Sequence, residues 1–386
     1  MNYPLLNNYS IPAIDFVKGQ GSYVWDSNGK KYLDFSSGIA VNNLGHCHPA
    51  WVKAISEQAQ TLVHCSNLYG IPVQRKLAQS LIDKIGPGKL FFCNSGTEAN
   101  EALLKFSRLF GKGESTHVVC AEEAFHGRTF GSMSATPQAK IQNGFKPLLD
   151  NFSFAPLNDI EAWKALVTGK TTAVLLEPIQ GETGINVAEV SFLKELKAHC
   201  ESTNTLFLLD EVQTGIGRTG TFLAHEPSGV IPDGVALAKG LGNGFPIGAI
   251  WINEKHVDLF TPGCHGSTFG GSPMASTAAL TTLQVIDDEN LLKAVNEGSK
   301  PWINKLNNLA DTHSTKIKAI KGVGYLIGIA MHSDITKTIA SLTEAGLITV
   351  PSANNVIRLL PPLNASNDEL NESIRIINTI LEKTTS

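Results

Sequence analysis

The chain has 386 residues, of which 42% are hydrophobic and 17% charged, so it is long enough for two domains with a large buried core. Its 31 basic and 35 acidic residues give a formal net charge of −4, which argues against the broad basic surface of proteins that bind nucleic acid or anionic lipid. We therefore expect its partners to be small molecules or further copies of the chain.

The cysteines and the N-terminus indicate a protein of the reducing cytoplasm. Six cysteines are present without CxxC spacing, at positions 47, 65, 93, 120, 200 and 264. No Lys or Arg precedes Lys18, so we expect no targeting segment, and no apolar run approaches the length of a membrane span. His46, Cys47 and His48 resemble a metal cluster, but adjacent side chains point to different sides. We expect loop or packing residues there and no bound metal.

The predicted elements begin with a β-hairpin and continue with alternating strands and helices. The stretch YVWDSNGKKYLDF, residues 23–35, alternates apolar and polar residues around Asn28-Gly29, which is typical of a tight turn. From about residue 70, short apolar runs alternate with helical patterns. The strand candidates are KLFFC, HVVCAE, TTAVLLEPI, LFLLDE and GVALAKG, and the helix candidates are TEANEALLKFSRLF and SFLKELKAHCEST. This alternation predicts an α/β fold with a mainly parallel sheet flanked by helices.

The C-terminal part predicts a smaller α+β domain with which the N-terminal hairpin packs. Residues 274–310 have a helical pattern, IKGVGYLIGIAM and NNVIRLL are two strand candidates, and NDELNESIRIINTILEK has helical spacing. We place an N-terminal segment at 1–50, a large cofactor-binding domain at 51–310 and a small domain at 311–386.

The stretch LLDEVQTGIGRTG, residues 208–220, contains a formal GxGxxG motif. In a dinucleotide site these glycines open a helix directly after a strand, and an acidic residue follows about 20 positions later. Neither condition holds here. A carboxylate at the end of a central strand offers instead a fixed negative charge in the crevice where α/β sheets bind ligands. Asp210 would suit the protonated ring nitrogen of pyridoxal phosphate, the alternative being an Asp that caps a loop.

Two further segments offer the other groups that this cofactor needs. Lys239 follows an apolar strand and precedes a run of glycines, where desolvation would make its amine a nucleophile for a Schiff base; an ordinary surface lysine is the alternative. In NSGTEANEALLKF a strand ends, Ser95-Gly96-Thr97 form a polar turn and a helix begins. Such a helix start binds anions, so Gly96 and Thr97 are candidate phosphate contacts, unless Thr97 merely caps its own helix.

Eight blocks of this chain resemble, in order, those of the class III, fold-type I pyridoxal phosphate aminotransferases. They are GIAVNNLGHCHP, FFCNSGTEANEALLK, AFHGRTFGSM, EPIQGETG, LLDEVQTGIGRTG, ALAKGLGNGFPIGA, HGSTFGGSP and IRLLPPL. The resemblance implies a homodimer with shared active sites. It also implies the following roles: Lys239 as the Schiff-base lysine, Asp210 as partner of the pyridinium, Gln213 beside the ring's phenolic oxygen, Phe125 stacked on the ring, Gly96 and Thr97 on the phosphate, and Thr268 on the phosphate of the neighbouring subunit's cofactor.

The same resemblance indicates how substrates bind. Arginine binds carboxylates bidentately, and Arg128 and Arg358 are candidates for this role, although either could be a structural ion-pair member. In related ω-aminotransferases an arginine matching Arg358 binds the α-carboxylate of glutamate, and a glutamate matching Glu182 neutralises it when an ω-amino donor enters. Arg128 would then take the carboxylate of that donor.

The identity of the donor depends on the segment around Gly38 and Ile39. Ornithine transaminases carry a Tyr near this position, which contacts the donor's free α-amino group. An apolar wall suits an acylated nitrogen better, because leaving an ammonium unpaired costs more than leaving an amide. The blocks most resemble transaminases that move the δ-amino group of N2-acetylornithine to 2-oxoglutarate, with Ser267 helping to fix the acyl donor.

Several alternatives stay open at this point. Ornithine, succinylornithine, succinyl-diaminopimelate and 4-aminobutyrate transaminases would share every cofactor residue. More distant alternatives are an aminomutase of the same fold and a non-enzymatic binding protein.

Overall fold

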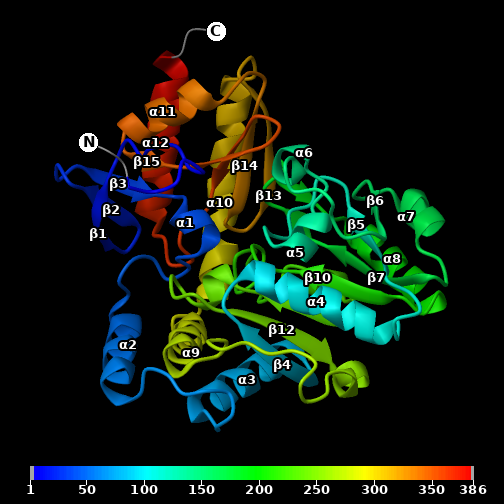
Figure 1. Cartoon of the computed structure of the whole chain (residues 1–386). Coiled ribbons are helices and arrows are strands. Elements are labelled where there is room, and N and C mark those ends of the chain that lie inside the picture. Colours follow the sequence, from blue (N-terminus) through cyan, green and yellow to red (C-terminus); the bar gives the residue numbers. More distant parts are fainter. Residues whose placement is uncertain (1–3, 384–386) are drawn as a thin grey trace.

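The computed structural model describes residues 4–383, and its centre is a seven-stranded sheet (Figure 1). The strand order is β4-β12-β11-β10-β7-β5-β6. Strand β12 runs antiparallel to both neighbours and the other adjacent pairs are parallel, which confirms the α/β fold with a mainly parallel sheet. The bounds are β4 Gly88–Cys93, β5 His117–Ala121, β6 Phe152–Ala155, β7 Thr171–Leu176, β10 Leu206–Asp210, β11 Gly234–Leu237 and β12 Gly248–Asn253.

Both faces of this sheet are buried, which explains its nearly continuous apolar strands. In β10, Leu206 and Leu208 belong to the core on one face, together with helix α4 (Gly96–Phe110), whereas Phe207 and Leu209 belong to the core on the other. That second face is covered by α7 (Ile160–Leu166), α8 (Val190–Ser202), α3 (Pro72–Ile85) and α9 (Pro273–Asp288). Polar residues of the site can therefore lie only at the ends of the strands. The carboxyl ends of β7, β10 and β11 meet at one pocket.

The two ends of the chain meet above this sheet (Figure 1). The N-terminal strands β1 (Phe16–Gln20), β2 (Tyr23–Asp26) and β3 (Lys31–Asp34) form a sheet that β15 (Leu347–Ile348) extends, parallel to β3. A second sheet is antiparallel, in the order β13-β14-β17-β16. Its strands are β13 Ile317–Val323, β14 Leu326–Met331, β16 Val350–Ser352 and β17 Val356–Leu359. The predicted packing of the N-terminal hairpin with the C-terminal part is confirmed by the β3–β15 pairing.

Two local expectations were wrong, and two strands of the central sheet were not expected. Residues 274–310 are two helices, α9 and α10 (Leu291–Thr312), because Asn290 breaks the helix with φ 52°. The candidate strand at 320–331 contains a hairpin turn at Gly324, which has φ 61° and separates β13 from β14. Strands β6 and β12 were not anticipated.

The remaining elements are short or lie at the rim. Helix α12 follows the expected C-terminal pattern and packs on α10, which also packs on β13. The domain boundaries proposed at residues 50 and 310 stay predictions. The other elements are α2 Pro49–Thr61, α5 Phe130–Ser134, α6 Ala139–Gln142, α11 Thr336–Glu344, α12 Asn367–Lys383, β8 Ile179–Gln180, β9 Asn186–Val187, and the 3₁₀ turns η1 Glu226–Ser228, η2 Lys239–Leu241 and η3 Glu254–Leu259. Among residues 4–383, no helix is both long and apolar enough to cross a membrane.

A left-handed turn, α1 (Ser37–Ala40), lies beside the pocket. Its four residues have φ values of 44°, 62°, 65° and 61°, and Ile39 is a β-branched residue that adopts this region only under strain. The start of the turn is anchored by two groups. The Asp34 carboxylate accepts hydrogen bonds from Ser36 and Ser37, and the Ser37 hydroxyl donates to the carbonyl of Leu360 at 2.6 Å. Val41, the next residue, lines the pocket.

Candidate active site

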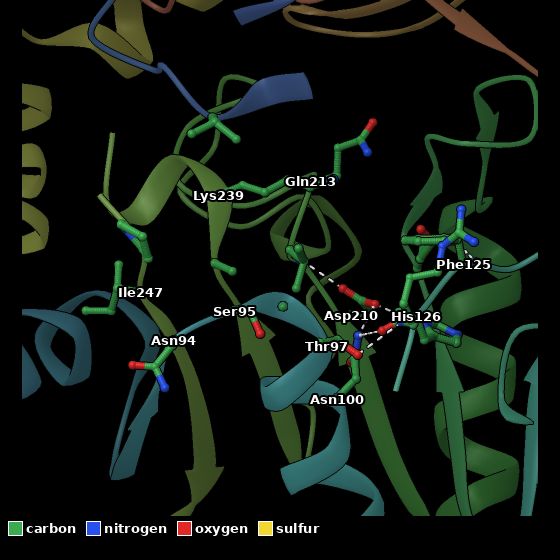
Figure 2. Close-up of a pocket in the computed structure, with 18 of the residues that line it drawn as sticks. Asn94, Ser95, Thr97, Asn100, Phe125, His126, Asp210, Gln213, Lys239 and Ile247 are labelled. Carbon is green, nitrogen blue, oxygen red and sulfur yellow. Dashed lines mark hydrogen bonds and ion pairs between the residues drawn. The ribbon is translucent and has the colours of Figure 1, made fainter. Parts of the chain in front are cut away.

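The pocket has a volume of about 350 Å³ and lies at the carboxyl ends of β7, β10 and β11, beside the start of α4. Such an edge is where open α/β sheets bind their ligands. Six predicted cofactor residues line it: Gly96, Thr97, Phe125, Asp210, Gln213 and Lys239. In Figure 2, Asp210, His126 and Asn100 converge on one point, while Lys239 and Phe125 enter from different sides.

Asp210 ends β10, the middle strand of the sheet, and is 3% exposed. Its Oδ2 accepts a hydrogen bond from Nδ2 of Asn100 at 2.7 Å and lies 2.8 Å from Nδ1 of His126, while Oδ1 accepts from the N–H of Val212 at 3.0 Å. Three such partners fix the direction of the carboxylate. Because a carboxylate has about four lone-pair sites, Asp210 can still accept a hydrogen bond from a cationic ring nitrogen.

Lys239 begins η2 directly after β11, and its φ of 44° is unusual for a residue with a side chain. Burial lowers the pKa of its amine, and the negative charges of Glu182 and Asp210 only partly oppose this shift. A lower pKa increases the fraction of neutral amine, which is the form that attacks an aldehyde. The strained backbone at this nucleophile is typical of functional sites.

The N-terminus of α4 is suited to an anion. Ser95 is the N-cap, and its Oγ accepts from the N–H of Glu98 at 3.3 Å. At Gly96 a side chain is excluded, because a Cβ atom would lie 2.7 Å from Cγ1 of Val212. Because Ser95, Gly96 and Thr97 line the pocket, the backbone of this helix start faces the space that a phosphate would occupy.

Thr97, the second candidate phosphate contact, has a hydroxyl that is bound by the loop at residues 128–129. It accepts hydrogen bonds from the N–H groups of Arg128 and Thr129 at 3.2 and 3.3 Å. Because the Thr129 hydroxyl donates to the carboxylate of Glu101, the Thr97 hydroxyl must donate to Thr129, 2.8 Å away. The hydrogen bonds of this hydroxyl are thus used within the protein, and only the backbone of Thr97 is available for an anion.

Arg358 and Glu182 lie behind Gln213, just outside the lining of the pocket. Nη1 of Arg358 lies 2.6 Å from Oε1 of Glu182, and Nη2 lies 3.2 Å from Oε2, so the pair is bidentate. Gln213 joins it through contacts of 3.0 Å to Arg358 and 3.2 Å to Glu182. Burial works to raise the pKa of Glu182, but the charge and hydrogen bonds of Arg358 outweigh it and leave that pKa below its ordinary value.

The other predicted substrate residues lie on different sides of this pocket. Arg128 lines it, is exposed, and has its guanidinium 5.8 Å from the centre of the Phe125 ring. Ser267 and Thr268 line a neighbouring hollow instead. Asn94 borders both cavities and donates to Oγ of Ser267 at 3.2 Å, whereas Thr268 is exposed. Within one chain, therefore, Thr268 is not brought to the pocket.

Among the lining residues that the sequence did not single out are Asn100, His126 and Glu177, whose polar side chains bear on the chemistry of the site. Asn100 is one helical turn beyond Gly96, so its position on α4 could have suggested that it faces the site. Glu177 directly follows β7, as Asp210 ends β10, and the same strand-end argument could have found it. No comparable sequence pattern identifies His126, because it lies on a loop and its contact with Asp210 depends on the fold.

Pyridoxal phosphate fits this set of residues. The pocket combines the amine of Lys239, an anion at Asp210 with a free acceptor position, an aromatic side chain at Phe125, and the open helix start at Gly96. These groups match the aldehyde, ring nitrogen, ring face and phosphate of the cofactor. His46 and His48, by contrast, are used in contacts with Asp34 and Glu289, at 2.8 and 3.0 Å.

Comparisons with known proteins agree with one another along the whole chain. The family model described as aminotransferase class-III matches residues 6–381. The acetylornithine aminotransferase of Oceanobacillus iheyensis is 44% identical over 97% of this chain and 95% of its own, and that of Bacillus anthracis is 45% identical over 98% and 97%. Among solved structures, an ornithine aminotransferase from Toxoplasma gondii, with pyridoxal phosphate at partial occupancy in its active site, has a TM-score of 0.94 at 31% identity, covering 98% of this chain and 92% of its own.

Proposed function

The chain belongs to the class-III aminotransferases and is a pyridoxal phosphate-dependent transaminase, and from this premise we propose its substrates. It transfers the δ-amino group of N2-acetyl-L-ornithine to 2-oxoglutarate, giving N-acetyl-L-glutamate 5-semialdehyde and L-glutamate. This is a step of arginine biosynthesis. The observation that carries the proposal is the bidentate Arg358–Glu182 pair beside the pocket, which supports alternating use of one site by two different substrates.

The residues of the pocket divide the chemistry among them. When bound, pyridoxal phosphate supplies an aldehyde that condenses with amines and a cationic ring that withdraws electrons from the reacting carbon. Asp210 would keep the ring nitrogen protonated, Phe125 would pack on the ring, and the start of α4 would hold the phosphate. Lys239 would hold the aldehyde when no substrate is bound, and its amine, once free, would move the proton at the δ-carbon of the donor.

The Arg358–Glu182 pair would let one site accept substrates with and without a carboxylate next to the reacting carbon. While the pair is closed, the charge of Arg358 is neutralised, which suits a donor whose reacting end carries no carboxylate. When glutamate or 2-oxoglutarate enters, its α-carboxylate replaces Glu182 on the guanidinium. Glu182 can leave because its side chain is 28% exposed, whereas that of Arg358 is 1% exposed. We assign the distant carboxylate to Arg128, which lines the pocket and is exposed.

We expect Arg358→Ala to separate the two half-reactions. It should lower kcat/KM for 2-oxoglutarate roughly 10- to 100-fold, the scale of losing charge-assisted hydrogen bonds, and should affect the half-reaction with the amino donor much less. Single-turnover absorbance measurements of each half-reaction would test this. Arg375→Ala, an exposed position on α12, is the matched control. Equal losses in both half-reactions would contradict the proposed role.

The donor preference rests on the segment that contains Gly38 and Ile39. Ile39 is 40% exposed, and Val41 of the same segment lines the pocket, so this rim is apolar and offers no partner to a free ammonium. We expect kcat/KM for N2-acetylornithine to exceed that for ornithine by about 10- to 100-fold, because an unpaired polar group costs on the order of 1–3 kcal/mol. A panel of ω-amino donors assayed with 2-oxoglutarate would test this. Faster turnover of ornithine, 4-aminobutyrate or a succinylated donor would reassign the substrate.

A homodimer with shared active sites also belongs to the proposal. Thr268 is exposed and lies in a hollow next to the pocket, and the neighbouring Phe269 is 63% exposed. These features support a role for this segment at the cofactor phosphate of a second subunit.

A cytoplasmic location is proposed as well, and it is supported by the absence of any disulfide among the six cysteines, all of which lie in the described part of the chain.

A further inference from the structure

Glu177 is a buried carboxyl group of the pocket to which no role has been given above. It follows β7 directly, and β7 and β10 are parallel neighbours whose register pairs Leu176 with Leu209. Glu177 therefore stands beside Asp210 at the same edge of the sheet. Both residues line the pocket, and they are 5% and 3% exposed. Two adjacent buried carboxyl groups cannot both ionise cheaply.

The number of hydrogen-bond partners distinguishes Glu177 from the neighbouring acidic residues. Asp210 has three close partners, and Glu182 has the guanidinium of Arg358. Glu211, which is 1% exposed, has four: the Thr214 hydroxyl, the N–H groups of Ala224 and His225, and the imidazole of His225. Within residues 4–383, Glu177 accepts one hydrogen bond, from the N–H of Phe125 to Oε2 at 3.3 Å, and no Lys, Arg or His lies within ion-pair distance of it.

We propose that Glu177 is an uncharged carboxylic acid in the working enzyme and acts as a positioning residue for the loop that carries Phe125 and His126. Its carbonyl oxygen holds the N–H of Phe125, the residue proposed to pack on the ring. Because Glu177 carries no charge, Asp210 remains the anion available to the ring nitrogen. The inference rests on the proposed cofactor site, but it does not depend on which amino donor reacts.

The charges around Glu177 support this protonation state. Those that face it are Asp210 on β10, Glu182 beyond β8 and Lys239 after β11. Arg358 and His126 lie one contact further away, on Glu182 and Asp210 respectively. Burial raises the pKa of Glu177 well above its ordinary value, the charge of Asp210 raises it further, and the N–H of Phe125 and the more distant Lys239 only partly oppose this.

A raised pKa makes the folded state bind a proton that the unfolded chain has lost. The stability that this proton contributes is fully present at pH values below the pKa that Glu177 has in the unfolded chain. It is lost as the pH rises through the higher pKa that Glu177 has in the folded protein. Glu177→Gln removes this dependence, since the amide is neutral at every pH and its oxygen can still accept from Phe125. We therefore expect the Tm of this variant to equal or exceed that of the wild type, with a difference that grows from acidic to alkaline pH.

The decisive experiment combines spectroscopy with cofactor binding. The infrared spectrum of the wild-type holoenzyme at neutral pH should contain a protonated-carboxyl C=O band that shifts in D₂O and is missing in Glu177→Gln. The Kd for pyridoxal phosphate should change by less than about threefold in Glu177→Gln but rise about tenfold in Glu177→Ala, where the N–H of Phe125 loses its partner. The matched control is Glu211→Gln, which should lower the Tm and leave the band intact, because its carboxylate is held by four donors.

Three results would overturn the proposal. The first is the same carbonyl band in the wild type and in Glu177→Gln. The second is a loss of cofactor affinity in Glu177→Gln as large as that in Glu177→Ala, which would mean that the negative charge is needed. The third is a Glu177→Gln protein that does not fold, because a neutral acid should accept a neutral isostere. None of these readouts measures transamination, so a wrong donor assignment would leave them unchanged.

Discussion

Replacing Lys239 with alanine is expected to lower the rate of transamination by at least about 10³-fold, because the variant loses the residue that we propose both as the covalent anchor of the cofactor and as the group that moves the proton. The pocket offers no substitute, since among the described residues lining it Lys239 is the only lysine. Steady-state assays with N2-acetylornithine and 2-oxoglutarate would measure the loss. Borohydride reduction of the wild-type holoenzyme, followed by peptide mass analysis, should place the cofactor on Lys239.

The matched control for this variant is Lys255→Ala, which removes an exposed lysine from η3. It should leave the rate and the labelling unchanged. Substantial catalysis by Lys239→Ala, or labelling of another lysine, would show that a different amine carries the cofactor.

Replacing Asp210 with asparagine should cost at least about 100-fold in kcat, the scale of removing one preorganised charge-stabilising group. Asparagine keeps the shape and can keep the contact with the Val212 N–H, but its neutral oxygen no longer favours a protonated ring nitrogen. The donor half-reaction should slow as strongly as the overall reaction, because both require the electron-withdrawing ring. Stopped-flow absorbance with donor alone would measure this.

Asp210→Glu is the informative companion to that variant. It preserves the negative charge and changes its position, so it should retain more activity than Asp210→Asn. If the two variants were equally impaired, geometry and not charge would be the main contribution of this residue. If Asp210→Asn remained fully active, the proposed partner of the ring nitrogen would be wrong.

The parts of the fold and site that could be predicted are those that depend on short, continuous stretches of sequence. An apolar run that ends in Asp210 or Lys239 identifies a strand tip, and the parallel arrangement then gathers such tips at one edge. The adjacency of Glu177 and Asp210 could not be predicted, because it requires the order and register of β7 and β10. Strand β12 was missed because it follows a Gly- and Pro-rich loop, and its antiparallel direction breaks the βα alternation.

Other features depended on contacts between distant segments. The hydroxyl of Thr97 looked available for an anion, but the loop at 127–129 occupies it. The bidentate geometry of Glu182 with Arg358 joins residues 176 positions apart. No local pattern predicts the left-handed turn, since Ile39 itself disfavours a positive φ.

That turn also has a consequence for the order in which the enzyme is made. The Ser37 hydroxyl is bonded to a carbonyl 323 residues later in the chain, at Leu360, and this bond helps to offset the backbone strain. On the ribosome, residues 37–40 emerge early with the local hydrogen bonds to Asp34, but they lack the Leu360 carbonyl until the residue after β17 has been translated. The same late strand carries Arg358. A nascent chain can therefore assemble the central sheet while it still lacks both the fully anchored turn beside the pocket and the guanidinium proposed for the keto acid, so that catalytic competence arrives only after β17 and Leu360 have been made.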